Sequence, residues 1–402
     1  MKTLLHRCLA PFFGAAFFAL SLLPAAAADA AKWDGVTKRM QAFVNNSTIA
    51  GSVTLVATRD QVVNVQAVGF ADLAAKTPMR ADHLFWIASM TKPITGACVL
   101  MLQDEGKLSV DDAVEKHLPE FKGQWLVTAK GSDQLTLGRP ARPITLRDLL
   151  THTSGMGNFA APRMDCSLAE LVTGVSQVPL QFPPGSQWSY NNPGINTLGR
   201  VVEVVSGQRF EDFLQQRVLD PLAMKDTTFW PTAAQAKRIA KAYKPGKDGK
   251  GLEEVSNAFL QGALSDRRRT PHPAGGLFST AADVAVFYQM MLSGGEWRGK
   301  RLLSKSSVEQ ITRTQTGDIK TGFTDGMSWG FGFQVVKDPQ GVTAMLSPGT
   351  FGHGGAYATQ SWADPKKGLV LVMMIQRTGF SNGDKSVVRQ SFQEGAVAAF
   401  SE

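Results

Sequence analysis

The 402-residue sequence has little of several features, and each shortage excludes a class of protein. It has three cysteines, which are too few for a small scaffold stabilised by disulfides. Its six histidines do not show the His-Glu-x-x-His spacing of a zinc hydrolase. It also lacks a glycine-rich phosphate loop and a dinucleotide-binding fingerprint. The sequence therefore gives no reason to expect a metal ion or another cofactor.

Charge is modest as well. Charged residues make up 19% of the chain and hydrophobic residues 43%, as in ordinary globular proteins, and the formal net charge is +8. The basic run Arg267-Arg268-Arg269 has no interleaved aromatic residues and lies between turn residues. A nucleic-acid surface needs a broader basic face. We interpret the run as a solvated loop and expect no nucleic-acid partner.

Long apolar runs are absent after the first 30 residues, so we expect no stable membrane insertion of the mature protein. At the N-terminus, Lys2 and Arg7 precede an apolar stretch over residues 9–23, and small residues follow. This layout is typical of a secretory signal peptide, and the stretch is shorter than the ~20 residues of a membrane span. We therefore expect residues 1–30 to be a signal peptide and the mature domain, residues 31–402, to be periplasmic or secreted.

Strand-like patterns occur at both ends of the chain. Residues 51–58 and 62–72 are strand-like, and so are residues 329–336, 358–363 and 369–375. The middle of the chain is mainly helix and loop. This order favours an α+β fold in which one sheet is built from both termini and a helical part is inserted.

The expected boundaries follow from that order. The sheet subdomain would comprise residues from about 31 to 88 and from about 266 to 402, and the helical subdomain residues from about 89 to 265. Cys98 lies on an apolar helix face, which favours a buried free thiol, although pairing of Cys98 with Cys166 stays open. The sequence does not define an oligomeric state.

Ser89 and Lys92 are three residues apart at the start of a predicted helix, and hence on one face. Ser89 is a good N-cap residue, so we expect the helix to begin there. A serine becomes nucleophilic when a base lies within hydrogen-bond reach, and a lysine with a lowered pKa can be that base. The spacing alone arises roughly once by chance in a chain of this composition, so a purely capping serine is the alternative.

Two further motifs add context. Tyr190-Asn191-Asn192 is the only Tyr-x-Asn in a chain with four tyrosines, and a Tyr and an Asn in a loop suit a proton shuttle and a substrate-orienting amide. His353-Gly354 and Gly355 precede a strand-like run, where paired glycines allow a close backbone or ligand approach. A packed tyrosine turn and a hairpin turn are the structural alternatives.

The three motifs, in this order, resemble the penicillin-recognising serine hydrolases. This superfamily includes class C β-lactamases, D-alanyl-D-alanine carboxypeptidases and family VIII esterases. The resemblance covers residues from about 33 to 400, and residues 149–155, 182–192 and 274–280 are similar to the family as well. It implies a β-lactamase/transpeptidase-like α+β fold with an antiparallel sheet flanked by helices.

The resemblance also implies roles for individual residues. Ser89 would be the acylated nucleophile, and Lys92 and Tyr190 would share the general-base and general-acid steps in an order that the sequence does not decide. Asn192, together with the His353-Gly354-Gly355 motif, would bind substrate. The backbone N–H groups of Ser89 and Ala356 would form an oxyanion hole.

One residue departs from the β-lactamase pattern. The third motif of those enzymes usually begins with lysine, whereas this chain has His353, which is mostly neutral above pH ~6.5. Recognition of a substrate carboxylate should therefore be weaker, which favours small esters over β-lactams and D-Ala-D-Ala peptides. Arg377, just after the last strand, is a candidate to restore the cation.

Other functions compete with this interpretation. Gly326-Met-Ser328-Trp-Gly330 matches the nucleophile elbow of α/β-hydrolases, with Asp338 and His353 downstream. That motif needs a helix after the serine, but the residues that follow alternate like a strand. The alternative outside the enzymes is a catalytically silent protein that binds or senses peptidoglycan. The joint presence of serine, lysine and tyrosine argues for turnover instead.

Overall fold

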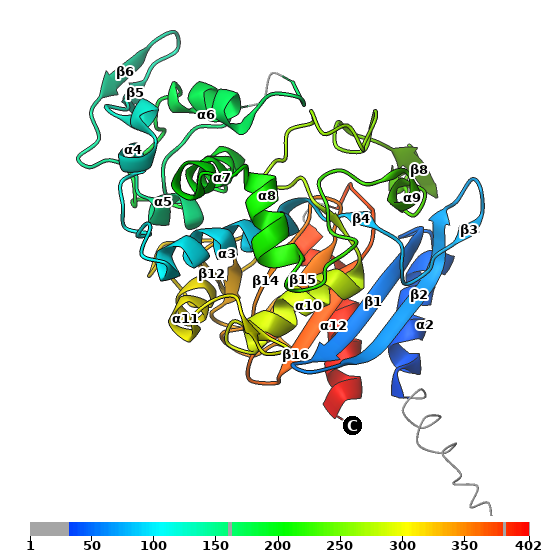
Figure 1. Cartoon of the computed structure of the whole chain (residues 1–402). Coiled ribbons are helices and arrows are strands. Elements are labelled where there is room, and N and C mark those ends of the chain that lie inside the picture. Colours follow the sequence, from blue (N-terminus) through cyan, green and yellow to red (C-terminus); the bar gives the residue numbers. More distant parts are fainter. Residues whose placement is uncertain (1–31, 160–162, 381–382, 402) are drawn as a thin grey trace, which may run out of the picture.

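The structure is a computed structural model that describes residues 32–159, 163–380 and 383–401. The expected signal peptide, residues 1–30, lies outside the described residues. The central element is an eight-stranded sheet with the order β12-β13-β14-β15-β16-β1-β2-β3, and every neighbouring pair is antiparallel (Figure 1). Its strands are β1 (Gly51–Thr58), β2 (Val62–Asp72), β3 (Thr77–Pro78), β12 (Met327–Trp329), β13 (Gln334–Val336), β14 (Phe351–Gly354), β15 (Gln360–Asp364) and β16 (Leu369–Met374).

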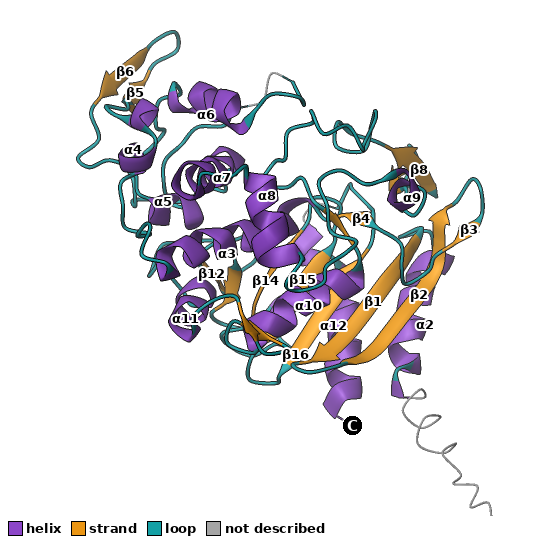
Figure 2. Ribbon diagram, viewed as in Figure 1, coloured by secondary structure: helices purple, strands orange, loops and turns teal. Residues whose placement is uncertain are grey.

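The sheet joins the two ends of the chain, as the sequence predicted. Strands β1 and β16 pair in register from Val53 opposite Met374 to Thr58 opposite Leu369. Helices α2 (Asp34–Asn45) and α12 (Val387–Ser401) pack together on one face, and α10 (Ala281–Leu292) packs on the other face (Figure 2). Because both faces are covered, β15, β16 and nearly all of β1 are buried along their whole length, and β16 is apolar throughout. The predicted α+β fold is confirmed.

The segment between β4 (Phe85–Trp86) and β9 (Phe278–Ser279) is mainly helix and loop, and its apolar side chains join the core on the α10 side of the sheet. Its first helix, α3 (Thr91–Asp104), is buried from Thr91 to Leu102 and lies against α7 (Asn192–Ser206) and α11 (Lys305–Thr312). The remaining helices are α3 (Thr91–Asp104), α4 (Val114–His117), α5 (Leu146–Leu150), α6 (Leu168–Ser176), α7 (Asn192–Ser206), α8 (Phe210–Leu214), α9 (Ala233–Ala236) and α11 (Lys305–Thr312).

Short two-stranded ribbons lie outside the main sheet. The ribbon β4–β9 immediately precedes the turn that carries Ser89, so it fixes the entry to that turn. The ribbon strands are β4 (Phe85–Trp86), β5 (Leu126–Lys130), β6 (Leu135–Gly138), β7 (Ala242–Pro245), β8 (Leu252–Val255), β9 (Phe278–Ser279), β10 (Glu296–Trp297) and β11 (Lys300–Arg301).

Two local predictions were wrong. Ser89 does not cap α3, because it lies in a 3₁₀ turn, Ala88–Met90, and Met90 occupies the N-cap position without a side-chain bond. The predicted strand over residues 329–336 is a hairpin, in which β12 and β13 are separated by a turn with Gly332 at φ +76°. A glycine in this left-handed region breaks the apolar run that suggested one strand.

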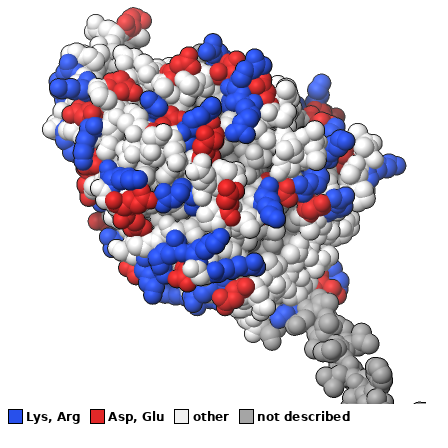
Figure 3. Space-filling model, viewed as in Figure 1, with Lys and Arg blue, Asp and Glu red and all other residues white. Residues whose placement is uncertain are grey.

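The remaining expectations concern cysteines, membrane spans and the basic run. Cys98 and Cys166 are both buried free thiols, so the expectation for Cys98 is confirmed. No helix in residues 32–159, 163–380 and 383–401 is long and apolar enough to cross a bilayer. Lysine and arginine are interspersed with aspartate and glutamate over the face in Figure 3. Within the basic run, Arg268 pairs with Asp266 and Arg269 donates to backbone carbonyls.

Candidate active site

Ser89 is presented by a strained turn at the start of α3. The preceding residue, Ala88, has φ +45°, in the left-handed region that residues other than glycine rarely adopt. The Thr91 hydroxyl donates to the Ala88 carbonyl over 2.7 Å and so supports this turn from within α3. The turn leaves Ser89 only partly buried, at the edge of two cavities.

Lys92 lies one helical turn further on and is fully buried. Its Nζ is 3.0 Å from Ser89 Oγ and also donates to the Ala274 carbonyl over 2.5 Å. Burial removes water from the amine and lowers the pKa of Lys92 well below its ordinary value. A neutral amine with a free lone pair can accept the Ser89 proton, so the geometry suits a general base.

Tyr190 completes the group from the loop before α7. Its ring centroid is 4.8 Å from Lys92 Nζ, and its hydroxyl interacts with the Ser89 side chain. Burial raises the pKa of Tyr190, so the phenol keeps its proton and is able to donate it. The three side chains that the sequence linked by motif therefore meet at one place.

His152 holds the Tyr190 loop in position. Its Nδ1 accepts from the Asn191 backbone N–H over 3.1 Å, and its carbonyl accepts from the Ser189 N–H over 2.9 Å. Its ring centroid is 4.6 Å from that of Tyr190. Burial lowers the pKa of His152 well below its ordinary value, which leaves the imidazole neutral. These contacts make His152 a structural residue that holds the loop before α7.

The paired glycines bring β14 against the turn that carries Ser89. A Cβ on Gly355 would lie 2.1 Å from Thr359 Oγ1 and 2.6 Å from the Ile87 carbonyl, so only glycine permits this approach. The next residue, Ala356, consequently faces Ser89 across the site. Among the described residues, neither the Ser89 nor the Ala356 backbone N–H has a protein acceptor. Two such donors on one side of a nucleophile suit an oxyanion hole.

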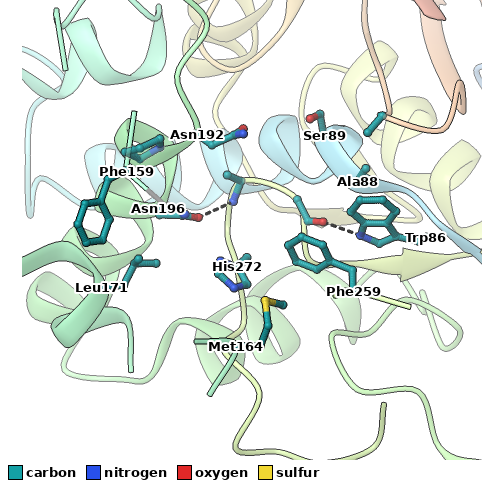
Figure 4. A pocket seen from close by; sticks show the side chains of 14 residues that line it. Trp86, Ala88, Ser89, Phe159, Met164, Leu171, Asn192, Asn196, Phe259 and His272 are labelled. Atoms are coloured by element: carbon teal, nitrogen blue, oxygen red, sulfur yellow. Dashed lines mark hydrogen bonds between the residues drawn. The ribbon is translucent and has the colours of Figure 1, made fainter. Parts of the chain in front are cut away.

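Two cavities meet at Ser89 and share Asn192 and Ala356. The apolar cavity has a volume of about 360 Å³ (Figure 4). Its larger side chains are Trp86, Phe159, Met164, Leu171 and Phe259. The polar cavity has a volume of about 280 Å³. Its side chains include Tyr190, Phe323, His353 and Asp384.

The polar cavity contains the third motif. Burial lowers the pKa of His353 to about 4, so this histidine is neutral near pH 7. The Asp384 carboxyl group lines the same cavity and accepts from Gln360 Nε2 and Gln334 Nε2. The suggestion that Arg377 restores a cation is wrong, since its guanidinium stacks on Phe380 at 3.9 Å and lines neither cavity.

The competing nucleophile is excluded by the fold. Ser328 lies in strand β12, is 2% exposed, and bonds Thr316 Oγ1 over 3.2 Å. A hairpin follows it where the α/β-hydrolase elbow requires a helix, and neither Ser328 nor Asp338 lines either cavity. Within the described part of the chain, no three histidine, cysteine, aspartate or glutamate side chains are grouped to hold a metal ion.

Sequence reasoning missed two contributors to the site. Asp384 belongs to no motif and reaches the cavity from the 3₁₀ turn Gly383–Lys385, where it bonds Gln334 of β13 and Gln360 of β15. A Cβ on Gly354 would lie 2.1 Å from Asp384 Oδ1. The glycine in the sequence therefore indicates a close contact at this position but does not identify the residue that makes it. The Ala274 carbonyl was also missed, although residues 274–280 had been noted as similar to the family.

Comparisons with known proteins agree with this geometry. The family model described as Beta-lactamase matches residues 36–392. Protein Rv1367c of Mycobacterium tuberculosis (strain ATCC 25618 / H37Rv) is 33% identical over 374 residues, covering 85% of this chain and 90% of the relative. Esterase EstB of Burkholderia gladioli is 30% identical over 356 residues, covering 81% and 86%.

A solved structure supports the fold. EstCE1, described as a hydrolase with promiscuous acyltransferase activity, superimposes with a TM-score of 0.76 at 23% identity and covers 92% of this chain and 100% of its own. At this identity the likeness concerns the fold alone. Together with the family match over most of the sequence, it shows that the chain belongs to the β-lactamase family, within the serine β-lactamase and penicillin-binding-protein-like superfamily.

Proposed function

We propose that the protein is an exported serine hydrolase that acts through an acyl-enzyme on Ser89, most readily on small carboxylic esters. The observation that carries the proposal is the buried Lys92 amine, which lies 3.0 Å from Ser89 Oγ and has a lowered pKa. A purely capping serine would have no use for a buried neutral amine beside it. Desolvating a lysine is costly, so its position supports a chemical role.

In the acylation step, Lys92 Nζ takes the Ser89 proton while Oγ attacks the ester carbonyl carbon. The carbonyl oxygen becomes an oxyanion between the Ser89 and Ala356 N–H groups, each worth about 3–4 kcal/mol of barrier in comparable hydrolases. Collapse of this intermediate breaks the bond to the leaving oxygen. Tyr190 gives its proton to that oxygen, and the protonated Lys92 restores the proton to Tyr190.

Deacylation repeats these steps with water. The neutral Lys92 and Tyr190 together take one proton from water as its oxygen attacks the acyl-enzyme carbonyl. The second tetrahedral intermediate is held by the same two N–H donors. When the bond to Ser89 Oγ breaks, the serine regains its proton and the carboxylic acid leaves. Apart from the substrate and this water, no group outside the chain is required for proton or atom balance.

The polar cavity supports esters over carboxylate-bearing lactams and peptides. A substrate carboxylate needs a permanent cation, but His353 is neutral near pH 7 and Asp384 adds a carboxyl group beside it. The Arg377 guanidinium packs on the Phe380 ring and does not supply this cation. A charge-assisted hydrogen bond typically contributes about 1.5–3 kcal/mol. Its absence should therefore lower kcat/KM for carboxylate-bearing substrates by roughly tenfold or more.

This preference is testable with purified mature protein. We expect kcat/KM for nitrophenyl butyrate to exceed that for a chromogenic cephalosporin by at least about tenfold, for the reason just given. Both rates are read by absorbance under one set of conditions, with Ser89→Ala as the blank. A cephalosporin rate above that of the ester would contradict the ester assignment and favour a β-lactamase or a D-alanyl-D-alanine carboxypeptidase.

Export is also part of the proposal, and it rests on the N-terminal sequence pattern. The full chain produced in a bacterial host should appear in the periplasmic fraction without its first ~30 residues, as expected for a cleaved signal. Intact-mass measurement of the purified protein reads the new N-terminus. Recovery of an uncleaved chain from the cytoplasmic fraction would count against export.

A further inference from the structure

The two cavities at Ser89 differ in chemistry, and this difference assigns them to the two halves of an ester. None of the 14 described residues that line the apolar cavity is an aspartate, glutamate, lysine or arginine. Its histidine, His272, is neutral near pH 7 because burial lowers its pKa to about 4. The polar cavity instead contains Asp384 and the phenol of Tyr190.

The position of Tyr190 fixes which half of the substrate enters which cavity. When the carbonyl carbon lies at Ser89 Oγ and its oxygen lies between the two N–H donors, the acyl chain and the leaving oxygen point in different directions. The leaving oxygen must come within hydrogen-bond reach of the proton donor. Tyr190 lines the polar cavity and is absent from the lining of the apolar cavity. The alcohol therefore faces the polar cavity.

The apolar cavity is a built feature rather than a gap between loops. Trp86 stacks on Phe259 with ring centroids 4.8 Å apart, and the Trp86 indole N–H donates to the Gly275 carbonyl over 2.8 Å. On the opposite wall, Phe159 packs against α6, where a Cβ on Gly174 would lie 2.7 Å from the Phe159 ring. In Figure 4, Ser89 and Asn192 lie at the upper edge of the cavity and Met164 lies at its lower edge.

We propose that the apolar cavity is the acyl pocket, and that the enzyme selects esters whose acyl group is uncharged and several carbons long. This inference rests on the proposed function and names its substrate class. Burial of each additional methylene group of the acyl chain in such a cavity should raise kcat/KM about fourfold. The selectivity should therefore depend on the acyl chain and hardly at all on the alcohol.

Ethyl hexanoate and hexyl acetate provide a matched test, because they are isomers in which the six-carbon and two-carbon chains are exchanged between the acyl and the alcohol side. We expect kcat/KM for ethyl hexanoate to exceed that for hexyl acetate by at least about tenfold, less than the full gain for four methylenes. Met164→Trp, which fills the cavity from its half-buried edge, should reduce this ratio to near one.

The control is Met345→Trp, the same substitution at another half-buried methionine that lines neither cavity. It should keep the wild-type ratio. A faster rate on hexyl acetate, or equal rates on the two isomers, would overturn the inference while ethyl acetate turnover leaves the proposed function standing. Failure to hydrolyse any of the three esters, with no fluorophosphonate labelling of Ser89, would overturn the proposed function and this inference with it.

Discussion

Replacing Lys92 by methionine is expected to lower kcat by about 10²–10⁴-fold, the usual contribution of a positioned general base. Methionine keeps the length and apolar stem of lysine but cannot accept the Ser89 proton. The measurement is kcat for nitrophenyl butyrate at neutral pH. Lys122→Met, which changes an exposed lysine, is the matched control and should keep wild-type activity.

The same variant has a second readout with a definite sign. An unfolded chain binds a proton on lysine below pH ~10.4, whereas folded Lys92 has a lower pKa. Between these two pKa values the unfolded state binds more protons, so the stability of the wild type falls as the pH is lowered. The loss is about 1.4 kcal/mol per pH unit relative to Lys92→Met.

Urea unfolding of both proteins at pH 7 and pH 9 measures this difference. The free energy of unfolding of Lys92→Met, relative to that of the wild type, should therefore be more favourable at pH 7 than at pH 9. If Lys92→Met retains wild-type kcat, or if the stability difference is the same at both pH values, then Lys92 is charged in the fold and is not the base.

The second large effect is expected at the nucleophile. Ser89→Ala should lower turnover by about 10⁴-fold or more, because loss of a nucleophile removes the covalent route and leaves only binding and the oxyanion donors. Ser328→Ala should keep most of the activity, since Ser328 lies in strand β12 and lines neither cavity. The opposite pattern would mean that both the nucleophile and the mechanism are wrong.

The sequence predicted the parts of the site that depend on short-range spacing. Ser89 and Lys92 are one helical turn apart, so their proximity follows once the helix is recognised. Tyr190 was placed by its motif and by the family resemblance. The sheet was predicted because strands buried on both faces are apolar runs, as in β16.

The parts that the sequence did not predict depend on the directions of individual side chains and on contacts between distant segments. Asp384 lines the polar cavity from the 3₁₀ turn Gly383–Lys385 that precedes α12, and no local sequence pattern marks it. Arg377 follows β16, and its guanidinium packs on Phe380 instead of pointing into the polar cavity. Hydrophobic periodicity does not indicate which of these two directions the side chain takes. A strained turn at Ala88 stands where the sequence predicted a helix cap at Ser89. This turn depends on the ribbon β4–β9 and on the Thr91 hydroxyl.

The central claim is that Ser89 is the acylated residue, and covalent labelling tests it most directly. Purified wild-type protein is treated with a fluorophosphonate, digested, and analysed by peptide mass spectrometry beside Ser89→Ala and Ser328→Ala. The account predicts one labelled residue, Ser89, in the wild type and in Ser328→Ala, and no label in Ser89→Ala. A label on Ser328, or equal labelling of Ser89→Ala and the wild type, would contradict it.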